Sequence, residues 1–111
     1  MQTLTNVGTT YDATSGSKGI GGGRIDFTGV TQIVFDVRVS KVGVGIQSWQ
    51  LWNETDGTQI GVIDDAGLVG DKSLTAAFLV ALSGEKLIRI RCKSTVASDD
   101  PIFYYGSIFP K

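Results

Sequence analysis

The heptapeptide IVFDVRV, residues 33–39, alternates apolar and polar side chains, and it decides the fold class. Successive side chains of an extended strand point to opposite faces. Four apolar side chains therefore share one face: Ile33, Phe35, Val37 and Val39. Asp36 and Arg38 fall on the other face, which is typical of a half-buried β-strand.

The same period of two recurs along the rest of the chain. It predicts strands at residues 46–53, 58–63, 86–94 and 102–109. Asp56-Gly57 lies between the first two of these and indicates a hairpin turn. Residues 64–67 (Asp-Asp-Ala-Gly) and 98–101 (Ser-Asp-Asp-Pro) indicate further turns.

The segment SLTAAFLVAL, residues 73–82, is ambiguous by composition. Its propensities suit a short helix, but a continuous apolar run bounded by glycines also suits a buried strand. We favour the buried strand because a turn at residues 83–86 follows it directly. The chain then reads as seven to eight short antiparallel strands, so we predict an all-β protein with a β-sandwich or jelly-roll fold.

The first 24 residues differ in composition from the rest. They are rich in Thr, Ser and Gly, and the run Gly19-Ile20-Gly21-Gly22-Gly23 is a poor interior for a strand or a helix. We therefore expect residues 1–24 to form an extended or flexible arm and residues 25–111 to form the β-sandwich domain. The arm is either a frayed terminus or a segment that docks on a neighbouring subunit, with Gly19, Ile20, Gly21 and Arg24 as candidate contacts.

Composition narrows the range of functions. The 111 residues carry 10 basic and 11 acidic side chains, a net charge of −1, which argues against a nucleic-acid partner. The longest apolar stretch, residues 76–82, is far too short to cross a bilayer, and residues 1–10 do not resemble a signal peptide. We therefore expect a soluble protein with neither nucleic acid nor membrane as a partner.

The residue types also argue against catalysis. The chain has no His, and its single cysteine, Cys92, falls on the apolar face of its strand, where a buried thiol is expected. Most Asp residues lie in predicted turns, so a pair of catalytic carboxylates is not indicated. A calcium site among Asp64, Asp65, Asp99 and Asp100 is conceivable but lacks ligand spacing. We expect no enzyme activity, no metal and no cofactor.

Three features could serve binding. Trp49 and Trp52 are three residues apart on one strand, so they point to opposite faces and one should be in the core. The other is either buried as well, in the core or in an oligomer, or exposed to a partner or a sugar. Arg89, Arg91 and Lys93 line one face of a strand, either as a solvated face or as a docking surface for an acidic protein. The last predicted strand carries apolar side chains on both faces, which indicates an oligomer contact through Tyr104, Tyr105 and Phe109.

Two long segments carry a resemblance to a known class of proteins. SWQLWNETDGTQIGVIDDAG (48–67) and GEKLIRIRCKSTVASDDPIFYYGSIFPK (84–111) resemble small structural proteins of tailed bacteriophages, particularly jelly-roll head-decoration proteins. The resemblance implies a homotrimer bound to the major capsid protein on the outside of the phage head, made in the host cytoplasm and located in the virion. It also implies that the arm contacts the capsid.

The function expected from the sequence is therefore a non-enzymatic capsid decoration protein that stabilises the phage shell. Two alternatives stay open. One is a component of a phage tail or fibre. The other is a carbohydrate-binding module that uses an exposed Trp to bind a glycan.

Overall fold

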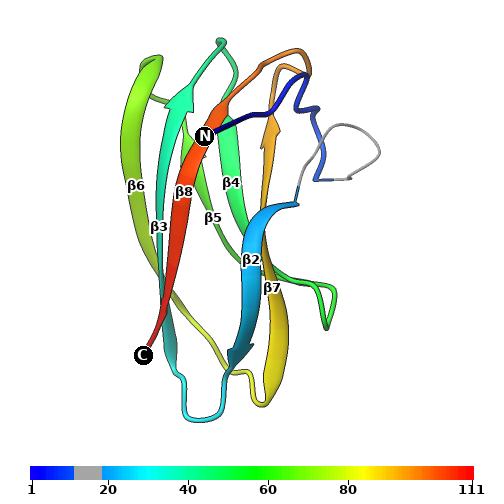
Figure 1. The fold of residues 1–111 in the computed structure, drawn as a ribbon, viewed down its shortest axis with the longest axis vertical. Helices are drawn as coiled ribbons and strands as arrows, with labels where there is room; N and C mark the ends of the chain where they lie inside the picture. The colour runs from blue at the N-terminus through cyan, green and yellow to red at the C-terminus, as the bar shows by residue number, and fades with distance from the viewer. Residues whose placement is uncertain (12–18) are drawn as a thin grey trace.

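The computed structural model describes residues 1–11 and 19–111, which form two four-stranded antiparallel sheets packed face to face (Figure 1). Sheet A has the strand order β1-β8-β3-β6, and sheet B has the order β2-β7-β4-β5. The strands are β1 (Gln2–Thr3), β2 (Gly19–Asp26), β3 (Gln32–Lys41), β4 (Gln47–Asn53), β5 (Thr58–Asp65), β6 (Gly70–Leu79), β7 (Glu85–Ser94) and β8 (Ile102–Pro110). The prediction of an all-β jelly-roll sandwich is confirmed.

Strand β3 occupies the interior of sheet A, between β6 and β8. The four apolar side chains predicted to share a face, Ile33, Phe35, Val37 and Val39, are all buried against sheet B. The hairpin predicted at Asp56-Gly57 joins β4 to β5, and Gly57 takes the positive φ of 67° that this turn needs. The strands predicted at residues 86–94 and 102–109 are β7 and β8.

The core lies between the inner faces of the two sheets. Trp49 from sheet B packs against Phe103 from sheet A, with ring centroids 6.1 Å apart, within the range for favourable aromatic contacts. Around this pair lie the other buried apolar side chains, Leu4, Val7, Phe27, Ile33, Phe35, Val37, Val39, Leu51, Ile88, Ile90 and Cys92. Each sheet therefore contributes its inner face to the apolar core.

The ambiguous segment at residues 73–82 is a strand, as predicted, but it is not buried on both faces. It belongs to β6, whose side chains alternate between half-buried and exposed. Phe78 turns inward and packs against the backbone at Gly61, where an added Cβ would lie 2.4 Å from the ring. Leu79 faces outward and is 85% exposed. The apolar run is continuous because the last outward residues of this edge strand, Ala77 and Leu79, are apolar, not because β6 is enclosed.

Residues 1–8 do not form the expected extended arm but pair with the rest of the domain. Strand β1 pairs with β8, and the segment after it continues along the loop before β8: Leu4 N donates to Pro101 O at 2.8 Å and Val7 N to Asp99 O at 3.0 Å. Leu4 and Val7 are buried in the core. Their side chains hold residues 1–8 on the domain. Residues 12–18, the remainder of the expected arm, lie outside the described residues.

The glycine run forms a strand, contrary to the prediction. It begins β2, the edge strand of sheet B, which pairs with β7 and contains a bulge between Gly19 and Gly21. Gly22 has a φ of +138°, and a Cβ there would lie 1.9 Å from the carbonyl oxygen of Ile88. Glycine is thus required because β2 approaches the β7 backbone more closely than a side chain permits. Gly19, Ile20, Gly21 and Arg24 belong to this sheet, and Ile20 packs against the core.

A buried carboxylate organises one end of the sandwich. Asp99 accepts hydrogen bonds from the Gly45 amide at 2.9 Å and from Ser94 Oγ at 2.8 Å, and so joins the β3–β4 loop to the β7–β8 loop. Gly43, with φ +99°, lies so close that a Cβ would be 2.0 Å from Asp99 Oδ1. A buried carboxylate is stable only when donors surround it in this way.

Replacement of Phe35 by Ala should lower the free energy of unfolding by about 3–5 kcal/mol, because it leaves a cavity between the sheets. Phe109→Ala is the matched control in the same sheet, since Phe109 is 53% exposed, and it should cost less than about 1 kcal/mol. Urea unfolding followed by Trp fluorescence measures both. Equal losses would contradict the assignment of Phe35 to the core.

Candidate functional site

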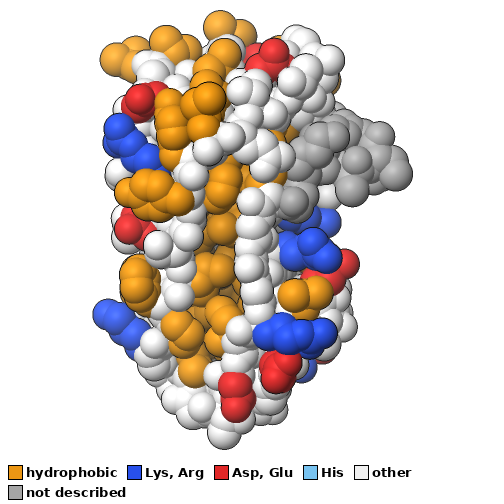
Figure 2. All heavy atoms as spheres, in the orientation of Figure 1, with side chains coloured by type: hydrophobic (Ala, Val, Ile, Leu, Met, Phe, Trp, Pro, Cys, Tyr) orange, Lys and Arg blue, Asp and Glu red, His pale blue; other side chains and the backbone are white. Residues whose placement is uncertain are grey.

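The first candidate is a groove between the free edges of the two sheets. Among the residues that the structure describes, β8 pairs with β3 and briefly with β1, and β2 pairs with β7, so β2 and β8 border a groove along the sandwich. Hydrophobic side chains run lengthwise down this face of the molecule (Figure 2). The groove has a volume of about 490 Å³.

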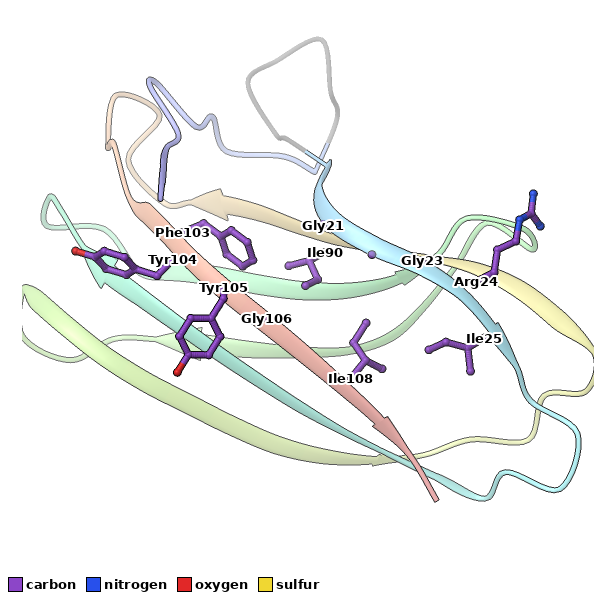
Figure 3. A pocket seen from close by; sticks show the side chains of 11 residues that line it. Gly21, Gly23, Arg24, Ile25, Ile90, Phe103, Tyr104, Tyr105, Gly106 and Ile108 are labelled. Carbon is purple, nitrogen blue, oxygen red and sulfur yellow. The ribbon is translucent and has the colours of Figure 1, made fainter.

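The walls of this groove are mostly apolar, although Arg24, Tyr104 and Tyr105 also line it. Phe103 and Ile90 lie between the sheets at one end, and Ile108 and Ile25 face each other farther along (Figure 3). Gly21 and Gly106 leave the middle open, because neither carries a side chain. Arg24 points away from the groove, toward solvent. Such walls suit an apolar ligand and offer few side-chain partners to a hydroxyl-rich one.

The second candidate is the outer face of sheet B, where the strand register places polar and aromatic side chains in three rows. Each row crosses β5, β4 and β7 in turn. The rows are Gln59, Trp52 and Arg89; Val62, Gln50 and Arg91; and Asp64, Ser48 and Lys93. Neighbouring strands are about 4.8 Å apart and alternate residues about 7 Å apart, so the nine side chains form a continuous platform.

Hydrogen bonds and cation–π contacts order this platform. Arg91 Nε donates to Gln50 Oε1 at 2.9 Å, and Gln50 Nε2 donates to Gln59 Oε1 at 2.9 Å. The Arg91 guanidinium lies 4.1 Å from the centroid of the Trp52 ring. In the next row, Ser48 Oγ donates to Asp64 Oδ1 at 2.6 Å. The side chains are therefore held in place across three strands before any ligand arrives.

Tyr11 adds a second aromatic ring to this face, and the sequence reasoning did not identify it. Its ring lies 5.4 Å from the Arg91 guanidinium and 4.8 Å from Lys93 Nζ. Burial raises the pKa of the Tyr11 phenol to about 12, so the hydroxyl stays protonated at neutral pH. Beside it is a hollow of about 340 Å³, lined by Tyr11, Ile46, Ser48, Gln59, Val62, Asp64, Lys93 and Thr95.

The two Trp residues divide as the spacing predicts. Trp49 is fully buried between the sheets, whereas Trp52 lies on the outer face of sheet B and is partly exposed. Arg89, Arg91 and Lys93 share that outer face, as the alternation of β7 predicts. Arg89 forms an exposed ion pair with Glu54 at 3.5 Å, and Arg24 forms one with Glu85 at 3.3 Å.

The aromatic residues of β8 lie on the opposite side of the molecule from Trp52. A bulge between Arg38 and Val39 of the β3–β8 register turns Phe103 inward and Tyr105 outward. Tyr105 and Phe109 are 57% and 53% exposed on the outer face of sheet A, and the Tyr104 hydroxyl donates to Asp71 Oδ1 at 3.1 Å. An oligomer contact through these three residues stays a prediction.

No catalytic group emerges among the residues described. Burial raises the pKa of the Cys92 thiol, which lies on the inner face of β7. Asp65 pairs with Lys72 at 2.9 Å, and residues 1–11 and 19–111 contain no group of three His, Cys, Asp or Glu able to hold a metal. Within the same ranges, no helix is long and apolar enough to cross a membrane.

Solved structures with a similar fold are carbohydrate-binding modules. The module CBM27-1 of Caldicellulosiruptor saccharolyticus, in complex with mannohexaose, matches 83% of this chain with a TM-score of 0.53 and 14% identity. The module CBM6cm-2 of Cellvibrio mixtus lichenase 5A, in complex with cellotriose, matches 80% of the chain and 72% of its own length, with a TM-score of 0.48 and 14% identity. The chain spans 58% of the length of the first module. No family model and no curated protein matches the sequence.

This likeness corrects the description of the chain as a bacteriophage virion protein. The β-sandwich and jelly-roll part of that description is confirmed by the fold. The viral part is corrected because the similar structure CBM27-1 is a carbohydrate-binding module and not a capsid protein. The homotrimer and the location in a virion stay predictions. Short polar turns and a closing aromatic strand, which carried the resemblance, are common to many β-sandwiches.

Cys92 should react with the thiol reagent DTNB at pH 8 only after unfolding, because burial both shields the sulfur and keeps it protonated. We expect the native protein to react about 100-fold more slowly than the protein in urea. The control is Ser83→Cys, which adds an exposed thiol and should show one fast-reacting equivalent. Rapid labelling of Cys92 in the native protein would contradict its place in the core.

Proposed function

We propose that the protein is a non-catalytic carbohydrate-binding module that binds a glycan on the outer face of sheet B. The observation that carries the proposal is the partly exposed Trp52 ring, held by Arg91 among cross-strand amide side chains. The jelly-roll fold, which this chain shares with a module solved in complex with mannohexaose, agrees with it.

The chemistry of a sugar requires both kinds of group that this platform offers. One face of a pyranose ring carries mostly C–H groups, which pack on an aromatic ring. The hydroxyls around the ring both donate and accept hydrogen bonds. Gln59 and Asp64 are exposed and offer an amide and a carboxylate two rows apart. Gln50 and Ser48 are buried, at 3% and 6% exposure, and hold these two side chains in place.

The other surfaces fit a glycan less well. The groove between β2 and β8 has mostly apolar walls and offers sugar hydroxyls few side-chain partners, since the Tyr104 hydroxyl already donates to Asp71. The outer face of sheet A presents Tyr105 opposite Arg38 and Phe109 opposite Val34, but among residues 1–11 and 19–111 no cation lies over either ring to hold it in place. The outer face of sheet B combines stacking with hydrogen bonding.

Arg91 also reduces the conformational entropy that is lost when a glycan binds. Its guanidinium stacks on Trp52 and is fixed by Gln50, so the ring and the amides are already ordered in the free protein. A ligand that meets ordered side chains loses less conformational entropy on binding.

Trp52→Ala should weaken glycan binding about 30-fold, a loss of about 2 kcal/mol, because it removes the stacking surface. Calorimetric titration with mannohexaose and with cello-oligosaccharides, after a glycan-array screen, measures the effect. Tyr105→Ala removes a more exposed ring from sheet A and should leave the affinity within about twofold.

The proposal fails if the intact protein binds no glycan on the array. It also fails if Trp52→Ala binds as tightly as the unchanged protein while its circular dichroism and urea midpoint show a native fold.

A further inference from the structure

We infer that one end of the sandwich inserts into a lipid surface through two neighbouring apolar loops, separate from the glycan platform. The loops join β3 to β4 and β5 to β6, and their sequences are VGVGI (42–46) and AGLV (66–69). Neither loop contains a polar or charged side chain, although exposed loops are normally polar. Their larger exposed side chains form the apolar tip: Val42, Val44, Ile46, Leu68 and Val69.

The strand register brings the two loops together. Lys41 pairs with Gly70 where β3 adjoins β6, and both residues border a loop. Gln47 pairs with Asp65 where β4 adjoins β5, at the other ends of the same loops. Each loop therefore crosses from one sheet to the other at the same end of the molecule. Hydrophobic side chains gather at this upper end in Figure 2, where Figure 1 places both loops.

The tip suits a lipid surface better than a folded partner. Val44 and Leu68 are 86% and 87% exposed, so their side chains project into solvent and do not pack on the domain. A standard protein–protein interface takes about 20–30 residues from each side, more than residues 42–46 and 66–69 supply. A bilayer needs only protruding apolar side chains that enter the headgroup boundary by about 5–10 Å.

The backbone of the first loop already has partners within the protein. An N–H or C=O group that leaves water without a hydrogen bond opposes insertion. Gly45 N donates to the buried Asp99 Oδ2 at 2.9 Å. Ile46 N donates to Thr95 Oγ1 at 2.9 Å, and Ile46 O accepts from Thr95 N at 3.1 Å. These bonds persist when the loop meets lipid, because none of them involves water.

The second loop is supplied in the same way by side chains of the adjoining strands. Lys41 Nζ donates to Gly67 O and Lys72 Nζ donates to Leu68 O, each at 2.6 Å. Gly67 N donates to Asp65 Oδ1 at 3.1 Å. Both loops are therefore held in shape with their apolar side chains outward, so insertion requires little further ordering.

Apolar burial, and not charge, drives the proposed insertion. Lys72 is paired with Asp65, and Lys41 is buried. The carboxylates of Asp64 and Asp71 are exposed on the strands that flank the second loop, so anionic headgroups gain no clear advantage. The expectation that a membrane is not a partner came from the lack of a spanning segment, which loop insertion does not need.

Flotation of the intact protein with vesicles of phosphatidylcholine alone tests the inference. We expect the protein to float with the vesicles and to remain bound in about 1 M NaCl, because salt screens charges and does not weaken apolar burial. Release of the bound protein by salt would show electrostatic adsorption and would overturn the inference.

Charged substitutions in the tip locate the contact. Val44→Asp combined with Leu68→Asp should lower the vesicle partition coefficient at least tenfold, because a carboxylate at each position would have to leave water. Leu79→Asp is the matched control: Leu79 is 85% exposed but lies at the opposite end of β6, and its substitution should change partitioning less than twofold. The urea midpoint checks folding, and Leu68→Asp alone serves as the milder variant.

A fluorescent label reports insertion directly. The environment-sensitive dye NBD, attached to Leu68→Cys, should shift its emission to the blue when vesicles are added. The same dye on Leu79→Cys should not shift. Cys92 is buried and should stay unlabelled in the native protein.

Three results would overturn the inference. The first is an intact protein that does not float with the vesicles. The second is an equal loss of flotation, or an equal dye shift, at Leu68 and Leu79. The third is self-association in light scattering that the tip substitutions abolish without any vesicle binding, which would assign the tip to a second copy of the chain. Each leaves glycan binding untouched, because Trp52 lies on the outer face of sheet B.

Discussion

The contact of Trp49 with Phe103 lies at the centre of the interior on which the rest of the molecule depends. Neither sheet is stable alone, because each would expose one apolar face to water. Packed together, the sheets bury both faces, and the aromatic pair bridges them where β4 and β8 pass each other. Because side chains alternate along a strand, every residue placed inward determines which of its neighbours point outward.

The outer face of sheet B is a direct consequence of that constraint. Trp49 points inward, so Trp52, three residues later on the same strand, points outward. Ile88, Ile90 and Cys92 fill the interior, and the residues between and beside them, Arg89, Arg91 and Lys93, must line the surface. A one-residue slip of β7 would put three cations into the core, so the same energy that holds the fold also holds the cation row in register.

The parts of the fold that alternation governs could be predicted from the sequence, as β3, β7 and the Asp56-Gly57 hairpin illustrate. The glycine run of β2 could not be predicted as a strand, because residues without side chains show no alternation of apolar and polar groups. Glycine is needed there because β2 lies so close to the backbone of β7. Tyr11 was missed for another reason: it reaches the outer face of sheet B from a segment distant in sequence. Trp52 and Arg91 could be proposed separately, but their stacking depends on diagonal neighbours across two strands, which a single sequence does not reveal.

The pairing of the first strands with the last has a consequence for the synthesis of the chain. β1 and β2 find their sheet partners only in β8 and β7, which leave the ribosome after all the intervening strands. Until then the core that Leu4, Val7 and Ile20 enter is incomplete, and β1 and β2 stay unpaired. The hairpin of β4 and β5 can already form at that stage. Closure of this sandwich is therefore a late, long-range step, and its rate is governed by the time that distant ends need to meet.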